Sequence, residues 1–169
     1  ASALEPHLDL SGLTKEEIVS IIGEAGIVGM GGATFPTDVK TVAGMGRVDT
    51  LIANACECEP YITADDALLC TYPEQVLRGM GVLMAVLEPK RAVLAVEDNK
   101  SEAVGILKKQ METFPGIELL ILPTRYPQGA EKQLIQAVTG RQVPPGALPK
   151  DVGCAVFNAA TFASMYKAV

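Results

Sequence analysis

Four short apolar runs, separated by segments with helical periodicity, constrain the fold of this 169-residue chain more than any other feature. Each run is apolar at almost every position, which is typical of strands covered on both faces of a sheet. Strands that alternate with helices are joined by crossovers and lie parallel. The sequence therefore predicts one α/β domain over residues 1–169, with a mostly parallel sheet and helices on both faces. The predicted strands are residues 48–53, 91–96, 117–122 and 152–157.

The segments between the runs carry helix signals. Thr14-Lys-Glu-Glu17 forms a capping box, in which each side chain can satisfy a main-chain amide of the other residue. Pro73 suits the first turn of a long helix, where its missing N–H costs nothing. The predicted helices are residues 15–25, 37–43, 73–87, 99–114, 129–139 and 158–169, and residues 54–66 are predicted to form an acidic loop.

Charge and length limit the partners. The chain has 14 Lys and Arg against 20 Asp and Glu, a formal net charge of −6, and its sequence pI is about 4.8. This balance disfavours nucleic acid and anionic membrane surfaces as partners. No apolar run approaches the roughly 18 residues that a helix needs to cross a bilayer, so no direct membrane span is expected.

Histidine and cysteine usage limits the chemistry. His7 is the only histidine, which argues against a His-based triad and against a His-rich zinc site. The four cysteines have no C-x-x-C spacing, and no secretory signal pattern is present, so reduced thiols in the cytoplasm are expected. Chemistry would then depend on carboxylates, cysteines, lysines or a cofactor.

A glycine-dense loop, Gly29-Met-Gly-Gly-Ala-Thr-Phe-Pro-Thr-Asp-Val-Lys40, is the most informative segment. Gly29, Gly31 and Gly32 allow main-chain amides to approach a ligand closely. The following helix start and Lys40 add positive charge, so the loop suits a phosphate. It lacks the third glycine of a dinucleotide fingerprint and the Gly-Lys-Ser/Thr of a P-loop. The alternative is a tight connection between two helices.

Polar residues follow the first predicted strand in Asn54-Ala-Cys-Glu-Cys-Glu-Pro. Open α/β sheets bind their ligands at this edge. Asn54 can donate and accept, whereas the Glu57 and Glu59 carboxylates can accept hydrogen bonds from hydroxyl or carboxamide groups. A metal site would need more converging ligands and is not expected. Cys56 and Cys58 are interpreted as small buried hydrophobes.

Three other positions have local interpretations. Asp65 and Asp66 are interpreted as negative charges at the start of a helix. Phe35 is either a core side chain or a ring that stacks on a planar ligand. Tyr126-Pro-Gln-Gly-Ala-Glu131 and Asn158-Ala-Ala-Thr161 each precede or begin a predicted helix, where ordinary solvation and capping are the alternatives to ligand binding.

Taken in order, G-M-G-G-A-T-F-P-T-D-V-K, N-A-C-E-C-E-P, Y-P-Q-G-A-E-K-Q-L and F-N-A-A-T resemble a known family. The chain resembles the flavin- and NADH-binding domain of the C subunit of Rnf-type electron-transport complexes. The same domain occurs in the FMN-carrying, NADH-oxidising subunit of respiratory complex I. The resemblance implies a Rossmann-like FMN-binding fold and a chain that is one domain of a larger protein.

The resemblance also implies which residues surround FMN. The phosphate and its neighbourhood would be held by the glycine loop and by the start of the last helix: Gly29, Gly31, Gly32, Lys40, Asn158 and Thr161. The flavin and its ribityl chain would be held by residues after the first strand and before the 129–139 helix: Asn54, Glu57, Gly129 and Glu131. For NADH, Phe35 would stack on the nucleotide, and Glu59 and Glu131 would contact its ribose or carboxamide.

The implied function is flavin-dependent electron transfer as an NADH:acceptor oxidoreductase. Hydride would pass from NADH to FMN, and single electrons would then go to iron–sulfur clusters outside this chain. The partner would be an iron–sulfur domain or subunit, and the location cytoplasmic, peripheral on the cytoplasmic face of the membrane. Two alternatives are the FMN domain of a related soluble corrinoid or amino-acid reductase, and a degenerate docking domain without catalysis. Cys56 and Ala130, which depart from the complex I pattern, motivate the second.

Overall fold

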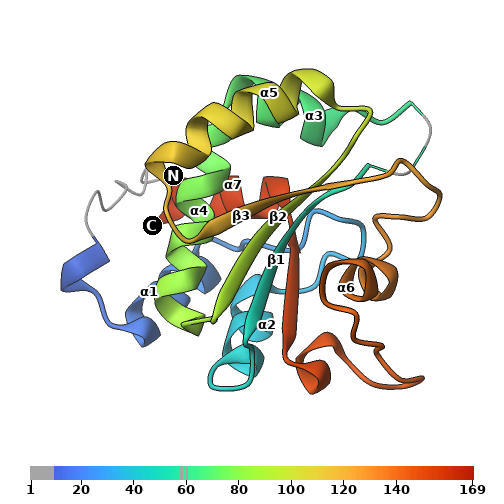
Figure 1. The fold of residues 1–169 in the computed structure, drawn as a ribbon. Coiled ribbons are helices and arrows are strands. Elements are labelled where there is room, and N and C mark those ends of the chain that lie inside the picture. Colours follow the sequence, from blue (N-terminus) through green and yellow to red (C-terminus); the bar gives the residue numbers. More distant parts are fainter. Residues whose placement is uncertain (1–9, 58, 60) are drawn as a thin grey trace.

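The computed structural model describes residues 10–57, 59 and 61–169, so the interpretations of His7 and Cys58 lie outside the described residues. The described chain forms a four-stranded parallel sheet in the order β3-β2-β1-β4 (Figure 1). The predicted α/β fold with a parallel sheet is therefore confirmed. The strands are β1 (Thr50–Ala55), β2 (Arg91–Glu97), β3 (Ile117–Leu122) and β4 (Cys154–Asn158).

Helices cover both faces of this sheet (Figure 1). Buried side chains of α1, α4, α5 and α7 share one apolar cluster with the sheet, and those of α6 pack with the opposite face. The α-helices are α1 (Lys15–Glu24), α2 (Thr37–Gly44), α3 (Ala64–Thr71), α4 (Pro73–Leu87), α5 (Ser101–Gln110), α6 (Glu131–Thr139) and α7 (Ala159–Ala168). Short 3-10 helices are Leu10–Gly12, Met111–Thr113 and Pro149–Val152.

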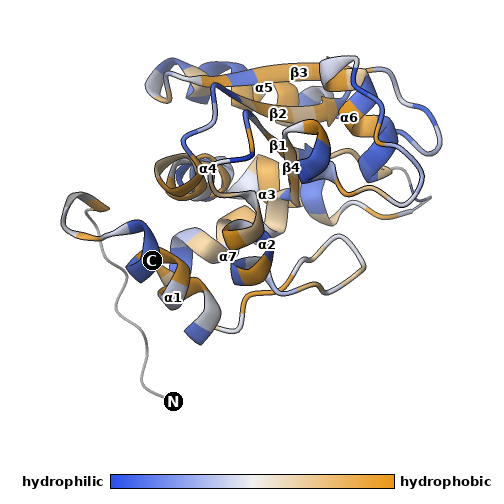
Figure 2. Cartoon of the chain, turned by 90° about the horizontal axis from the view of Figure 1, so that it is seen from below, coloured by the Kyte–Doolittle hydropathy of each residue, from blue (hydrophilic) through white to orange (hydrophobic). Residues whose placement is uncertain are grey.

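The central strands are apolar along their length because both of their faces are covered. Leu51 and Ala53 of β1 belong to the cluster beneath α4 and α7, whereas Ile52 faces α6. Figure 2 shows this apolar character running through the strands in the middle of the domain. A sheet buried in this way holds the carboxyl ends of its strands in a fixed arrangement, and those ends carry the polar motif residues.

Several predicted boundaries need correction. The first strand is β1, Thr50–Ala55 rather than 48–53, so Asn54 belongs to the strand and not to a loop. The predicted 99–114 helix is α5 followed by a 3-10 turn. Within the predicted acidic loop, α3 begins at Ala64, which places Asp65 and Asp66 in its first turn as their interpretation required. Val152 lies in a 3-10 helix, and the fourth strand starts at Cys154.

The chain order creates a switch point between β1 and β4. The connections from β1 to β2 and from β2 to β3 run through helices on one face, and α6 connects β3 to β4 across the other face. Open α/β sheets leave a crevice at such a point, beyond the carboxyl ends of the strands. The fold therefore predicts a ligand site next to the last residues of β1 and β4.

Candidate functional site

Two asparagines stand side by side at the switch point. Asn54 of β1 and Asn158 of β4 are register partners at the carboxyl ends of adjacent parallel strands. The Asn54 side chain donates to the carbonyl oxygen of Gly129 at 2.8 Å and accepts from the main-chain N–H of Cys56 at 3.0 Å. Asn54 thereby joins the end of β1 to the segment that leads into α6, and both segments are predicted to meet the flavin.

Asn158 organises the neighbouring side of the site. Its side-chain oxygen accepts from the N–H of Ala160 at 2.8 Å and caps α7. Its amide nitrogen donates to the Asp65 carboxylate at 2.7 Å. Gly31 of the glycine loop lies opposite, since a Cβ built on Gly31 would stand 3.4 Å from the Asn158 Cβ. The glycine loop and the start of α7 thus approach each other closely.

Thr161 anchors the glycine loop to α7. It is fully buried, and its hydroxyl oxygen accepts from the main-chain N–H of Met30 at 3.1 Å. The loop also bonds within itself, from the Gly29 N–H to the Phe35 carbonyl at 2.9 Å. Gly32 has φ +119°, a conformation that favours glycine. The loop does connect α1 to α2, so it is a helix connection, and it is also shaped and held against α7.

Lys40 and Glu131 form an ion pair beside β4. The Lys40 Nζ lies 2.9 Å from a Glu131 carboxylate oxygen and also donates to the Val156 carbonyl at 2.6 Å. The ammonium stands 4.9 Å from the centre of the Phe157 ring, within cation–π range. The side chains of Lys40 and Glu131 are 31% and 42% exposed, so a ligand can reach both. Lys40, predicted to lie near the FMN phosphate, and Glu131, predicted to lie near the flavin, therefore contact each other.

The side chain of Glu57 is buried rather than presented to solvent. Its two carboxylate oxygens accept from the main-chain N–H groups of Asp65 at 2.7 Å and Asp66 at 3.2 Å, which holds the start of α3. The Lys100 Nζ lies 3.3 Å from the same carboxylate, and the side chains of Lys100 and Glu57 are 10% and 4% exposed. The predicted flavin contact of Glu57 stays a prediction, and its carboxylate already has these partners.

Glu97, at the end of β2, adds a second buried carboxyl group next to this ion pair. It is fully buried, and neither of its side-chain oxygens has a well-aligned hydrogen bond among the described residues, although the main-chain N–H of Arg125 is near enough to favour its charged form. Burial raises the pKa of Glu97, and the Lys100 ammonium acts in the opposite direction. Burial likewise raises the pKa of Asp65 to about 6, although the hydrogen bond from Asn158 favours its charged form.

A cleft of about 370 Å³ opens beyond these carboxyl groups. It is bounded by segments that follow β1, β2 and β3, and it continues the carboxyl edge of the sheet away from β4. Tyr61 and Tyr126 are strongly exposed on its rim. The lining residues are Glu57, Glu59, Tyr61, Ile62, Thr63, Glu97, Asn99, Lys100, Thr124, Arg125 and Tyr126.

The structure brings most predicted site residues together. Contacts join Gly31 to Asn158, Lys40 to Glu131, and Asn54 to Gly129, while Thr161 holds the loop that contains Gly29 and Gly32.

Phe35 and Glu59, which are predicted to contact NADH, take no part in these contacts, and both are exposed. Phe35 is 52% exposed, so it is not a core side chain, and the alternative of a stacking ring is the one that its position allows. Glu59 lies on the cleft beyond β1, β2 and β3 rather than between β1 and β4. Their contacts with NADH stay predictions.

The sequence did not reveal the contacts of three residues at this edge of the sheet, Asp65, Lys100 and Glu97. The sequence assigns Asp65 only a helix-start charge, yet this residue also binds Asn158. It assigns no role to Lys100 or Glu97. The strand-end position of Glu97 was the available signal, because a carboxylate at the end of a buried strand sits where α/β sheets bind ligands.

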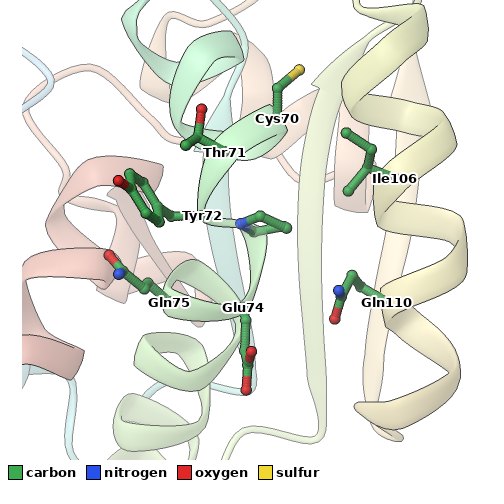
Figure 3. A pocket seen from close by; sticks show the side chains of 8 residues that line it. Cys70, Thr71, Tyr72, Glu74, Gln75, Ile106 and Gln110 are labelled. Atoms are coloured by element: carbon green, nitrogen blue, oxygen red, sulfur yellow. The ribbon is translucent and has the colours of Figure 1, made fainter.

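A second hollow, of about 360 Å³, lies between the α3–α4 junction and α5 (Figure 3). Ile106 and Gln110 of α5 lie across it from Cys70 and Glu74. Burial raises the pKa of the Cys70 thiol, so this cysteine is not activated as a nucleophile. None of the sequence-predicted site residues lines this hollow.

The described part of the chain has neither a metal cluster nor a membrane-spanning helix. Within it, no group of three or more His, Cys, Asp or Glu side chains is placed to hold a metal ion. The described helices are too short or too polar for any of them to cross a bilayer.

The chain is similar to proteins of one family. A model of the Nuo51 FMN-binding domain family matches residues 22–167. The C subunit of the ion-translocating oxidoreductase complex of Vibrio cholerae serotype O1 (strain ATCC 39541 / Classical Ogawa 395 / O395) is 42% identical over 166 residues, 98% of this chain and 21% of that protein. The Serratia proteamaculans (strain 568) protein of the same name is 43% identical over 164 residues, 97% and 23% respectively.

A solved structure shares the fold. The crystal structure of NAD+-reducing [NiFe]-hydrogenase in the H2-reduced state contains a chain that matches with a TM-score of 0.82 and 25% identity, over 90% of this chain and 30% of that chain. The chain spans about a fifth of the length of the curated relatives it matches. The family match covers every motif in the β1–β4 site, and the chain therefore belongs to the Nuo51 FMN-binding domain family.

Proposed function

We propose that this domain binds FMN at the β1–β4 switch point and serves flavin-dependent electron transfer in an Rnf-type complex. In this proposal NADH is the donor, and iron–sulfur clusters in another domain or subunit accept single electrons. The observation that carries the proposal is the meeting of motif residues from distant segments in three contacts: Gly31 with Asn158, Lys40 with Glu131, and Asn54 with Gly129. The relatives named as C subunits of ion-translocating oxidoreductase complexes support the assignment to that complex.

The residues present fit an FMN molecule. Gly31 has no side chain where a Cβ would face Asn158, which leaves main-chain amides open to a phosphate. The start of α7 and the Lys40 ammonium supply positive charge. Asn54, Gly129 and Glu131 offer polar groups of both kinds to a flavin ring and its ribityl chain. Bound FMN supplies the acceptance of hydride and the release of single electrons, and the protein supplies binding and orientation.

NADH would approach from the exposed side of the glycine loop. Phe35 is exposed there and can stack on a planar ring, and Glu59 and Glu131 can accept from ribose or carboxamide groups. The alternative of a docking domain without catalysis, which Cys56 and Ala130 motivate, predicts that the chain binds no FMN. In the larger protein the domain would lie at the cytoplasmic face of the membrane.

An absorbance spectrum of the purified chain titrated with FMN, before and after NADH, tests the proposal. Bound FMN that loses its visible flavin absorbance on addition of NADH is the expected result. A chain that is colourless as purified and leaves the fluorescence of added FMN unchanged would contradict FMN binding. Bound FMN that NADH cannot reduce would contradict the donor while leaving the cofactor in place.

Replacing Gly31 with aspartate is expected to abolish FMN binding. The new side chain would fill the space facing Asn158, and its carboxylate would repel the phosphate. We expect the dissociation constant for FMN, measured by fluorescence quenching, to rise at least about 100-fold.

Gly46→Asp is the matched control. Gly46 lies in the turn after α2, has φ +68°, and has open space where a Cβ would stand. Aspartate tolerates this left-handed conformation better than most residues, so the variant adds the same charge without closing the site. Retained FMN affinity in Gly31→Asp, or equal losses in both variants, would be evidence against a phosphate at this loop.

A further inference from the structure

A hydrogen bond between Asp65 and Asn158 links α3 to the start of α7. The Asn158 amide nitrogen donates to the Asp65 carboxylate at 2.7 Å, and Asp65 is only 8% exposed. The other side-chain atom of Asn158, its oxygen, accepts from Ala160. Both ends of this amide are therefore in use, and Asp65 and the Ala160 N–H together set which way the amide is turned.

The orientation of Asn158 matters for the glycine loop. Gly31 faces the Asn158 Cβ, and Met30 is held by Thr161 one turn further along the same helix. The loop therefore rests on the first turn of α7, whose capping residue is the one that Asp65 holds. In the proposed function this junction receives the FMN phosphate, so Asp65 stands one hydrogen bond away from the phosphate-binding surface.

The surroundings of Asp65 place two acidic groups and one basic group near it. Glu57 and Glu59, from the segment between β1 and α3, oppose its ionisation. Lys100, from the start of α5, favours ionisation, and α7 contributes only the neutral amide of Asn158. Burial is the largest influence and raises the pKa of Asp65 to about 6. Asp65 therefore changes charge close to neutral pH.

We propose that Asp65 is a positioning residue for the phosphate end of this site, which orients Asn158 and, once ionised, weakens the binding of a phosphate dianion. The inference rests on the proposed function. Its two parts are separable, because a protonated Asp65 still has a carbonyl oxygen that can accept from Asn158. Orientation therefore persists at every pH, whereas the repulsion exists only above the pKa of Asp65.

Two substitutions separate these parts. Asp65→Asn keeps an acceptor for the Asn158 amide and removes the charge. Asp65→Ala removes both and leaves the Asn158 amide without its partner. Asp66→Asn is the matched control, because it removes a neighbouring charge from the same helical turn, and the Asp66 carboxylate contacts the Cys70 thiol rather than Asn158.

The experiment measures dissociation constants for FMN and for riboflavin between about pH 5 and pH 8. The FMN phosphate itself titrates near pH 6, so each variant is compared with the wild type at the same pH. We divide the dissociation constant of the wild type for FMN by that of Asp65→Asn at each pH. We expect this ratio to rise about tenfold from about pH 5 to about pH 8, which corresponds to a shift of about one unit in the pKa of Asp65 when FMN binds. The ratio for riboflavin, which lacks the phosphate, should stay constant, and Asp66→Asn should follow the wild type.

The orientation of Asn158 has its own readout. Relative to Asp65→Asn, which also lacks the charge, Asp65→Ala is expected to weaken FMN binding about tenfold at both ends of the pH range, as the loss of a buried hydrogen-bond partner does. In the cofactor-free chain, the Asn158 side-chain amide resonance should shift with a midpoint of about pH 6 and lose that shift in Asp65→Asn.

Each outcome supports or overturns one part of the proposal. If both proteins bind FMN and the ratio of their dissociation constants does not change with pH, the charge effect is overturned and the proposed function stays intact. An Asp65→Ala variant that binds FMN as tightly as Asp65→Asn does overturns the positioning role. A ratio that changes equally for riboflavin shows that the effect is structural and also overturns the inference. A wild-type chain that binds no FMN at any pH overturns the proposed function and the inference with it.

Discussion

Replacing Gly79 with alanine is expected to destabilise the domain by about 3 kcal/mol or more. Gly79 lies in α4 where this helix crosses α7, and a Cβ there would overlap the carbonyl oxygen of Phe162 and stand 2.5 Å from its carbonyl carbon. The obstacle is helix backbone, which cannot turn aside as a side chain can. The two helices would have to move apart, and packed interiors resist such a shift. Urea denaturation of the variant and the wild type measures the difference.

Gly81→Ala is the control from the same helix. Gly81 lies two residues further along α4 and has open space where a Cβ would stand. Alanine favours a helix over glycine, so this variant is expected to be more stable by about 0.5–1 kcal/mol. Opposite signs at the two glycines are therefore expected, and a similar small effect at both would contradict the close α4–α7 crossing.

The Gly79 substitution also reaches the site through α7. This helix begins at Ala159, directly after its cap Asn158, and it carries Thr161, which holds the glycine loop. A displaced α7 would therefore loosen the predicted phosphate end, and we expect Gly79→Ala to bind FMN more weakly wherever it remains folded.

The strands could be predicted from the sequence because their burial on two faces leaves a continuous apolar run. The prediction failed at the end of β1, where the run stops at the polar Asn54. That residue belongs to the strand because its side chain bonds to Gly129 and to the N–H of Cys56. Gly129 is distant in sequence, so no local pattern could reveal the bond.

Helix α3 was hidden in the sequence for a similar reason. Its residues follow an acidic segment that is typical of a loop, and Thr63 makes no side-chain cap bond. The first amides of α3 are instead satisfied by the Glu57 carboxylate, which lies well before the helix. Local capping rules look for a partner within about three residues and therefore could not find this one.

In the candidate site too, local motifs revealed some residues, and others depend on contacts with distant parts of the chain. Gly31, Lys40, Asn54 and Asn158 stand in motifs that resemble a family, so the sequence could identify them. Asp65 and Lys100 act through contacts with distant residues, and their importance depends on burial. Burial of a charged side chain is set by the packing of α3 against α5 and α7, which periodicity and spacing do not report.

Replacing Lys100 with methionine is expected to destabilise the domain by about 3–5 kcal/mol near neutral pH, as removal of one partner from a buried ion pair does. Methionine keeps most of the apolar length of lysine but not its ammonium. Glu57 would keep its bonds to α3, yet its charge and that of Glu97 would repel each other without the cation that interacts with both. Lys15→Met is the control, because the Lys15–Glu88 pair is shorter, at 2.7 Å, but solvent-exposed. Its loss should cost less than about 1 kcal/mol.

The pH dependence of Lys100→Met identifies charge as the cause. Burial raises the pKa of Glu97 above its ordinary value, so ionised Glu97 opposes folding and its protonated form does not. Without Lys100 this pKa rises further, and the stability lost by the variant is therefore largest above that pKa and shrinks as the pH falls through it. Adding Glu97→Gln to Lys100→Met should recover part of the loss near neutral pH, since one of the two mutually repelling carboxylates is removed. An equal loss at acidic and neutral pH, with no recovery in the double variant, would mean that Lys100 contributes packing rather than charge.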